Sequence, residues 1–430
     1  MSLGAETIVT EAPLPVARPS FPWTNSLTLA LASFGPGLMV MLADTDAGSI
    51  VTAAQSGALW GYRMILPQIL LIPILYSVQE VTVRLGIATQ KGHGELIREH
   101  FGKGWAALSV STLFLTALGA LVTEFAGIAG VGSLFGIPPY LTVSVATFLL
   151  VGIVVTGSYR RVERVGIAIG LFELFFLPAA IMAGPNPAAM IRELPSLPLG
   201  NQDYLFLLAA NVGAVIMPWM VFYQQNAVID KGLTLKNLRA ARLDTLVGAI
   251  VTQLVMIAVI VATAATIGQT NPSSPLRGIE QIAVTLEPFL GWGLARVAFG
   301  LGMAGAAFVA ALVVSISASW GVGEALGQPH SLNSGPRRAP WFYLVYTLAL
   351  VGGAILVLSG APLVDLTIDV EAMNAALLPI VVGFLLVLEA RVLPTNLRMK
   401  GAHRAAVCAM SALVILFGLA VALHTLLPGI

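Results

Sequence analysis

Long apolar segments, separated by short polar connections, run along almost the whole chain. An α-helix needs about 20 predominantly apolar residues to cross a bilayer, and the chain holds about eleven segments of that length. They lie at approximately 26–58, 64–88, 105–131, 139–157, 163–184, 202–228, 240–268, 289–322, 341–359, 366–389 and 403–427. We therefore expect an all-α integral membrane protein with about eleven transmembrane helices.

Two of these segments contain residues that interrupt a helix. The first segment includes the sequence DTDAGS at 44–49, and the sixth includes GAVIMP at 213–218. Glycine and proline both weaken a helix at such positions, because glycine is too free and proline lacks an N–H. Paired broken helices indicate the substrate site of a transporter that is built from inverted repeats.

The spacing of the two breaks divides the chain into repeats. Each half contains five segments. Because five is an odd number of membrane crossings, the second half starts on the opposite side of the membrane and is inverted relative to the first. We expect a single transmembrane domain over 25–430 of the leucine-transporter type, with repeats at about 25–185 and 200–390 and an extra helix at about 403–427. Residues 1–24 are rich in proline and lack an apolar core with a cleavage site, so we expect a disordered cytoplasmic tail and no signal peptide.

Basic residues are distributed unevenly between the connections. Most of the 22 Lys and Arg residues follow even-numbered segments, among them Lys91, Arg160, Lys231, Arg337 and Arg398. Connections after odd-numbered segments hold only Arg63, Arg192, Arg277 and Arg296. Because Lys and Arg concentrate on the cytoplasmic side, we expect a cytoplasmic N-terminus and an external C-terminus in a prokaryotic-type plasma (inner) membrane.

Composition narrows the class of protein further. Only 10% of the residues are charged, against roughly 25% in soluble domains, and a net charge of +1 gives no reason to expect nucleic-acid binding. The single cysteine, Cys408, excludes a disulfide framework, and all five histidines fall in connections or at segment ends. We expect no enzymatic activity, no resident cofactor, and the lipid bilayer as the main partner of a working monomer.

The first break supplies charge at membrane depth. An ionisable residue there is costly and survives only beside a partner or a wet cavity, which makes Asp46 and Asp44 candidate cation ligands. Ser49 adds a neutral oxygen. The alternative for Asp46 is structural, because its carboxylate would also cap a helix that restarts near Gly48.

The second break supplies neutral donors. Pro218 removes one backbone donor and frees a carbonyl about four residues back, which is that of Ala214. Met217 offers a thioether sulfur, although methionine also fills gaps in apolar cores. Further along the same segment, Gln224 and Gln225 either line an aqueous pathway or bond to neighbouring helices.

Other polar residues lie within the apolar segments. Glu124, in the third segment, is a candidate charge next to the ion or a proton carrier, and its alternative is a hydrogen bond to a neighbouring helix. Asn374 in the tenth segment is a candidate oxygen donor. Glu80, Glu173 and Glu324 lie nearer to segment ends, so we expect them to be structural or to line a vestibule.

At these residues the chain resembles the Nramp family of divalent metal transporters, from about Leu31 to Leu427. The resemblance rests on GPG at 35–37, RLGIAT at 84–89 and AVIMP at 214–218. It implies that Asp46, Ser49, the carbonyl of Ala214 and the sulfur of Met217 bind the metal. The family sequence DPGN reads DAGS here, so Ser49 stands in place of an amide ligand.

Three departures from the family pattern concern proton coupling. The histidine that follows the Met-Pro pair is Trp219, the acid three residues before Glu124 is Leu121, and Asp44 is additional. These departures resemble the Nramp-related magnesium transporter branch, which implies alternating-access import of Mg²⁺ or Mn²⁺ with weak or absent proton coupling. A proton-coupled Mn²⁺/Fe²⁺ symporter and a sodium-coupled amino-acid carrier of the same fold remain alternatives. A membrane sensor would need an output domain for which the connections leave no room.

Overall fold

A computed structural model describes residues 33–270, 276, 281–283, 287, 291–359 and 363–426. The tail expected at 1–24 lies outside these residues. Within them the chain is helical and contains no strand. Nine stretches are long and apolar enough to cross a membrane, and each of the segments expected from sequence contains helix. The all-α membrane architecture is therefore confirmed, whereas the number of spans stays a prediction.

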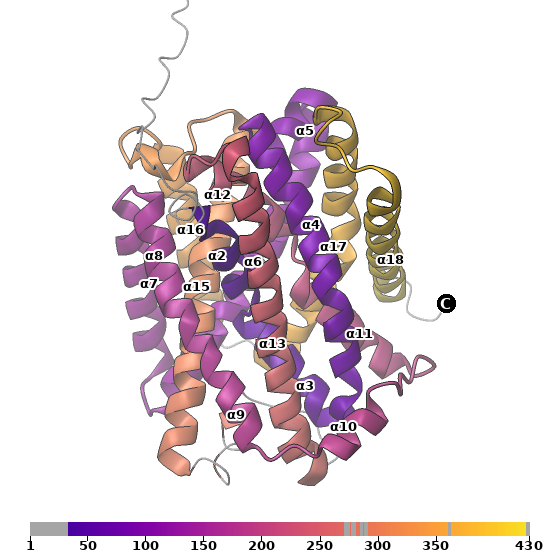
Figure 1. The fold of residues 1–430 in the computed structure, drawn as a ribbon. Coiled ribbons are helices and arrows are strands. Elements are labelled where there is room, and N and C mark those ends of the chain that lie inside the picture. The colour runs from indigo at the N-terminus through magenta and orange to yellow at the C-terminus, as the bar shows by residue number, and fades with distance from the viewer. Residues whose placement is uncertain are drawn as a thin grey trace, which may run out of the picture.

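The helices form one bundle (Figure 1). Five long, unbroken helices are α4 (Ile65–Thr89), α6 (Lys103–Leu134), α13 (Leu238–Thr270), α15 (Trp292–Leu326) and α17 (Leu363–Val392). The remaining unbroken helices are α5 (His93–Phe101), α7 (Pro139–Val155), α10 (Pro187–Glu193), α16 (Pro340–Leu358) and α18 (Gly401–Leu426). Short 3₁₀ turns lie at η1 (Gly61–Met64), η3 (Leu235–Asn237) and η4 (Leu332–Ser334).

Both expected breaks are present. The first separates α2 (Pro36–Asp44) from α3 (Ala47–Trp60), and the second separates α11 (Gln202–Val215) from α12 (Pro218–Asp230). Figure 1 shows α2 toward the end of the bundle that carries α5, and α3 toward the end that carries α10. A third interruption was not expected: α8 (Tyr159–Gly170) and α9 (Phe176–Met182) are joined by the 3₁₀ turn η2 (Leu171–Phe175).

Close helix packing around the breaks depends on small residues. A Cβ at Gly213 of α11 would overlap the backbone carbonyl of Glu371 in α17, and a Cβ at Gly127 of α6 would lie 2.6 Å from that of Ala47. Small residues let helices approach where lipid gives no hydrophobic drive for association. These approaches bring α6, α11 and α17 to the first break.

The start of α2 is held by the second half of the chain. The carboxylate of Asp244 in α13 accepts the backbone N–H groups of Gly35, Gly37 and Leu38 at 3.0, 2.7 and 3.1 Å. Lys231, just after α12, forms a buried ion pair with Glu163 of α8 at 2.8 Å and also donates to the Phe34 carbonyl. Because the first N–H groups of a helix have no internal partner, Asp244 acts as their cap from a distance.

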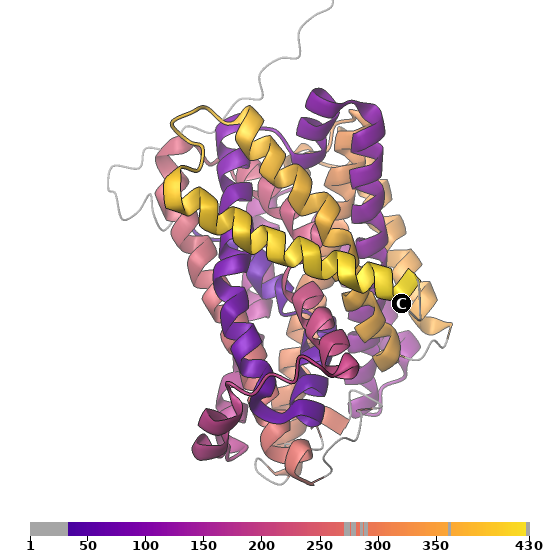
Figure 2. The same ribbon diagram turned by 90° about the vertical axis from the view of Figure 1, so that its right-hand side faces the viewer.

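The last helix lies apart from the bundle core. Figure 2 shows α18 crossing the outer face obliquely, against α17 and α4. Leu413 and Leu416 of α18 are 63% and 66% exposed. An exposed apolar face of this kind is typical of lipid contact, since lipid tails are as apolar as leucine.

Candidate metal site

Asp46 uses one of its two carboxylate oxygens to begin α3. Its backbone is extended, and Oδ1 accepts the N–H of Ser49 at 2.6 Å, which is a regular N-cap. The other oxygen, Oδ2, is fully buried and has no hydrogen-bond partner. Capping and ion binding therefore need not compete, because they use different oxygens.

A single hydrogen bond joins the two breaks. The hydroxyl Oγ of Ser49 donates to the carbonyl oxygen of Ala214 at 2.8 Å, and both residues are fully buried. Two oxygens on neighbouring vertices of an octahedron with metal–oxygen distances of about 2.05 Å lie about 2.9 Å apart. The separation of these two oxygens therefore suits adjacent ligands of a small cation.

Met217 lies at the N-cap of α12 and is fully buried. Its sulfur accepts a hydrogen bond from the indole Nε1 of Trp219 at 3.1 Å. No side chain caps α12, and its first residue is Pro218. The structure thus places Met217 at the second break, with its sulfur already bonded inside the chain.

Two glutamates from other helices reach the first break. Glu124 of α6 accepts the N–H of Ala47 at 3.1 Å through Oε2. Glu371 of α17 lies so close that a Cβ on Gly48 would overlap its Oε1. That oxygen has no partner, whereas Oε2 accepts the amide of Asn374 at 2.9 Å. Glu124 and Asn374 were both predicted from sequence to lie near the site, and Glu371 was not.

Asp44 bonds to α13 rather than to Ser49 or Ala214. It is the last residue of α2, and the hydroxyl of Thr252 in α13 donates to its Oδ2 at 3.4 Å, while Oδ1 has no partner. Glu173 of η2 is fully buried near Asp44 and Asp46. The expectation that Glu173 lies at a segment end was wrong, because η2 interrupts its helix midway.

Gln224 and Gln225 bond to neighbouring elements. The amide of Gln224 donates to Thr245 of α13 at 2.7 Å, and that of Gln225 donates to the Lys91 carbonyl at 2.8 Å. Their side-chain oxygens have no partner. Of the two interpretations offered by the sequence, the helix–helix bond describes the amide of Gln224, which joins α12 to α13, whereas the amide of Gln225 joins α12 to the connection before α5.

Sequence reasoning overlooked Glu371 and gave Glu173 a structural or vestibule role, although both carried the signal of a site residue. Glu173 and Glu371 are acids in apolar segments, and the rule that selected Asp44 and Asp46 applies equally to them. Within the described residues, no three His, Cys, Asp or Glu side chains are grouped as a preformed metal site. A cation at the breaks would therefore also need carbonyl, hydroxyl, sulfur or water ligands.

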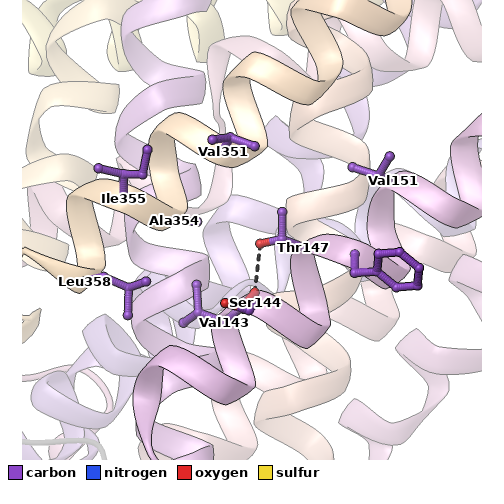
Figure 3. Close-up of a pocket in the computed structure, with 9 residues that line it drawn as sticks. Val143, Ser144, Thr147, Val151, Val351, Ala354, Ile355 and Leu358 are labelled. Carbon is purple, nitrogen blue, oxygen red and sulfur yellow. Dashed lines mark hydrogen bonds between the residues drawn. The ribbon is translucent and has the colours of Figure 1, made fainter.

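The surface groove in Figure 3 is a different kind of cavity. It measures about 410 Å³ and lies between α7 and α16, where Val143, Val351 and Ile355 are among its lining residues. Its polar groups are the hydroxyls of Ser144 and Thr147, and Thr147 already donates to the Val143 carbonyl at 2.7 Å. The lining holds no charge, so it does not suit a cation.

Comparison with known proteins identifies the family of the chain. Residues 37–424 match the family model described as natural resistance-associated macrophage protein-like, or Nramp. The chain belongs to the Nramp family. The "Divalent metal cation transporter MntH" of Yersinia enterocolitica is 28% identical over 308 residues, which is 69% of this chain and 73% of that protein. The protein of the same name from Klebsiella pneumoniae is 26% identical over 296 residues, 67% of this chain and 70% of its own length.

Solved structures show the same fold. The Eremococcus coleocola manganese transporter superposes on this Nramp chain with a TM-score of 0.74 at 18% identity, covering 93% of this chain and 87% of its own. MhsT in complex with L-phenylalanine gives a TM-score of 0.62 at 14% identity, covering 93% and 98%. The predicted Nramp membership and leucine-transporter-type fold are therefore confirmed.

Proposed function

We propose that this chain imports divalent metal cations, Mg²⁺ foremost and Mn²⁺ next, by alternating access. The observation that carries the proposal is the Ser49–Ala214 hydrogen bond, which brings the two broken helices together beside the free oxygen of Asp46. The names of the MntH relatives and of the manganese transporter support a divalent cation as the substrate.

In this proposal the ligands are Oδ2 of Asp46, the hydroxyl of Ser49 and the carbonyl of Ala214. Glu371 and Glu124 add negative charge within the same region, and Asp44 adds more from the side of α13. Oxygen ligands suit Mg²⁺, which demands near-octahedral geometry and keeps several waters. The buried carboxylates supply the charge that compensates a dehydrated divalent cation.

Weak or absent proton coupling is proposed because this chain lacks the histidine that the family carries after the Met-Pro pair. Trp219 occupies the position of the family histidine, and an indole cannot take up a proton near neutral pH. His93, at the start of α5, packs its ring against Phe222 of α12 with 4.9 Å between the ring centroids. Burial lowers the pKa of His93 to about 4, so it stays neutral near pH 7 and does not substitute for the missing residue.

A proton-coupled Mn²⁺/Fe²⁺ symporter is the second candidate. The sulfur of Met217 at the second break favours it, and Glu124 would carry the proton beside Asp46. A sodium-coupled amino-acid carrier is less favoured. The likeness to MhsT concerns the fold, and the buried carboxylates around the first break would repel the carboxylate of an amino acid.

Uptake into proteoliposomes with an internal pH dye tests these functions directly. We expect saturable Mg²⁺ uptake, weaker Mn²⁺ uptake and no acidification. Mn²⁺ uptake with acidification and none for Mg²⁺ would support the second candidate instead. Sodium-dependent uptake of an amino acid, without transport of any metal ion, would contradict both metal proposals. We further propose that the monomer is the working unit in a prokaryotic inner membrane, with its N-terminus in the cytoplasm.

A further inference from the structure

The sulfur of Met217 accepts a hydrogen bond from an aromatic side chain of the helix that follows it. Indole Nε1 of Trp219 donates to it at 3.1 Å, and both side chains are fully buried. Trp219 stands two residues on, in the first turn of α12, so the bond is local and short-range. An indole N–H is a donor without an acceptor. It therefore directs a partial positive charge at the sulfur.

We propose that Trp219 withholds the Met217 sulfur from the cation and thereby sets the site's preference for hard ions. This inference rests on the proposed function and adds the physical reason for its ion preference. To bind the sulfur, a cation would have to displace the indole N–H or approach beside it. In the second case the partial positive charge of the N–H would repel the cation. Soft thiophilic ions lose most, because sulfur is the ligand from which they gain most.

A second aromatic donor in α12 provides a matched comparison. The hydroxyl of Tyr223 donates to the sulfur of Met39 at 3.2 Å, and both residues are fully buried. Met39 lies inside α2 rather than at a break. Tyr223→Phe therefore frees a buried sulfur from an aromatic donor of α12 without touching the residues proposed to bind the ion.

The test compares a soft cation with a hard one in proteoliposomes. We expect Trp219→Phe to lower the KM for Cd²⁺ relative to the KM for Mg²⁺ about fivefold, which is the range of one net hydrogen bond. The same substitution in a Met217→Leu background should leave the ratio unchanged, because no sulfur remains to be freed. Tyr223→Phe should also leave the ratio unchanged.

Two results would overturn the inference. One is an unchanged ratio in a folded Trp219→Phe protein, and the other is an equal change in the Met217→Leu background. If Trp219→Phe does not fold, Met217→Leu alone decides the question. A sulfur that is withheld predicts less than about a twofold change in the Cd²⁺/Mg²⁺ ratio, and a selective tenfold loss of Cd²⁺ transport would show that the sulfur already binds. Absence of any metal uptake by the unaltered chain would overturn the proposed function itself, which separates the two failures.

Discussion

The two broken helices meet at one place but contribute different chemistry. At the first break, α3 begins with a carboxylate that caps it, because Asp46 accepts the N–H of Ser49. At the second break, α12 begins with Pro218 and no side chain caps it. The first break is therefore charged, and the second offers a neutral carbonyl beside a sulfur that is bonded to Trp219.

This difference divides the work of binding a cation. A carboxylate compensates the charge of a dehydrated ion, whereas carbonyl, hydroxyl and sulfur donors discriminate between ions by size and softness. Changes at the first break should therefore affect whether any ion is carried. Changes at the second break should affect which ion is preferred.

The strongest test separates the charge of Asp46 from its capping role. Asparagine caps a helix as well as aspartate does, so Asp46→Asn should keep the melting temperature within about 3 °C. Uptake should fall at least about 100-fold, since changes even to groups behind a metal ligand cost 10–100-fold. Unimpaired uptake would mean that Asp46 only caps α3. The charge of the first break would then not distinguish its role in ion binding from that of the second. Asp203→Asn, an exposed acid in the first turn of α11, is the control.

A second test disturbs the close packing of α11 against α17, which places Glu371 near the first break. Gly213→Ala adds a Cβ that would overlap the Glu371 carbonyl and lie 2.8 Å from the backbone nitrogen of Ala375. Overpacking of this kind costs about 1–3 kcal/mol, so we expect the melting temperature to fall by about 5 °C. Gly383→Ala in α17 meets open space and should be neutral or slightly stabilising. Equal stability of the two variants would contradict the close approach.

A third test removes the bond between the breaks. Ser49→Ala deletes the hydroxyl that donates to Ala214, and with it one proposed oxygen ligand. We expect the KM for Mg²⁺ to rise about fivefold to tenfold, as for the loss of one polar contact to a charge. Thr52→Val, one turn later in α3, removes a buried hydroxyl that has no partner and should change the KM by less than about twofold. A similar KM for both variants would show that the Ser49 hydroxyl does not matter.

The smallest effect is expected for Gln225. Its amide bonds to the Lys91 carbonyl outside the breaks, so Gln225→Leu should remove about 1 kcal/mol of stability and leave uptake within about twofold. Initial uptake rates, normalised to folded protein, measure this. A large loss of uptake with normal folding would extend the ion pathway along α12, in agreement with the interpretation that Gln225 lines an aqueous pathway.

Sequence alone located the breaks closely because their causes are local. Gly48 and Pro218 disturb a helix wherever it packs, and α2 ends at Asp44 while α12 begins at Pro218. The apolar segments were equally visible, since bilayer thickness fixes their length. Charge at membrane depth and the freed carbonyl before Pro218 indicated the candidate ligands, the resemblance to Nramp implied the same residues apart from Asp44, and their roles stay predictions.

The positions of Glu173 and Glu371 depend on tertiary packing and could not be derived in the same way. Glu371 lies near the start of the segment expected at 366–389 and was not selected as a site residue. In the structure α17 begins earlier, at Leu363, and passes beside Gly213 so closely that Glu371 reaches the first break. No periodicity in a single segment reports which neighbour a helix face will meet.

The capping of α2 by Asp244 has a consequence for observing transport. Helix α2 has only nine residues, and α13 bonds to both of its ends, through Asp244 at the start and Thr252 at Asp44. Any departure of α2 from α13 must expose the amides of Gly35, Gly37 and Leu38 to water. The rate of deuterium exchange at these amides therefore reports how often α2 separates from α13. It can be measured without measuring the flux of any ion.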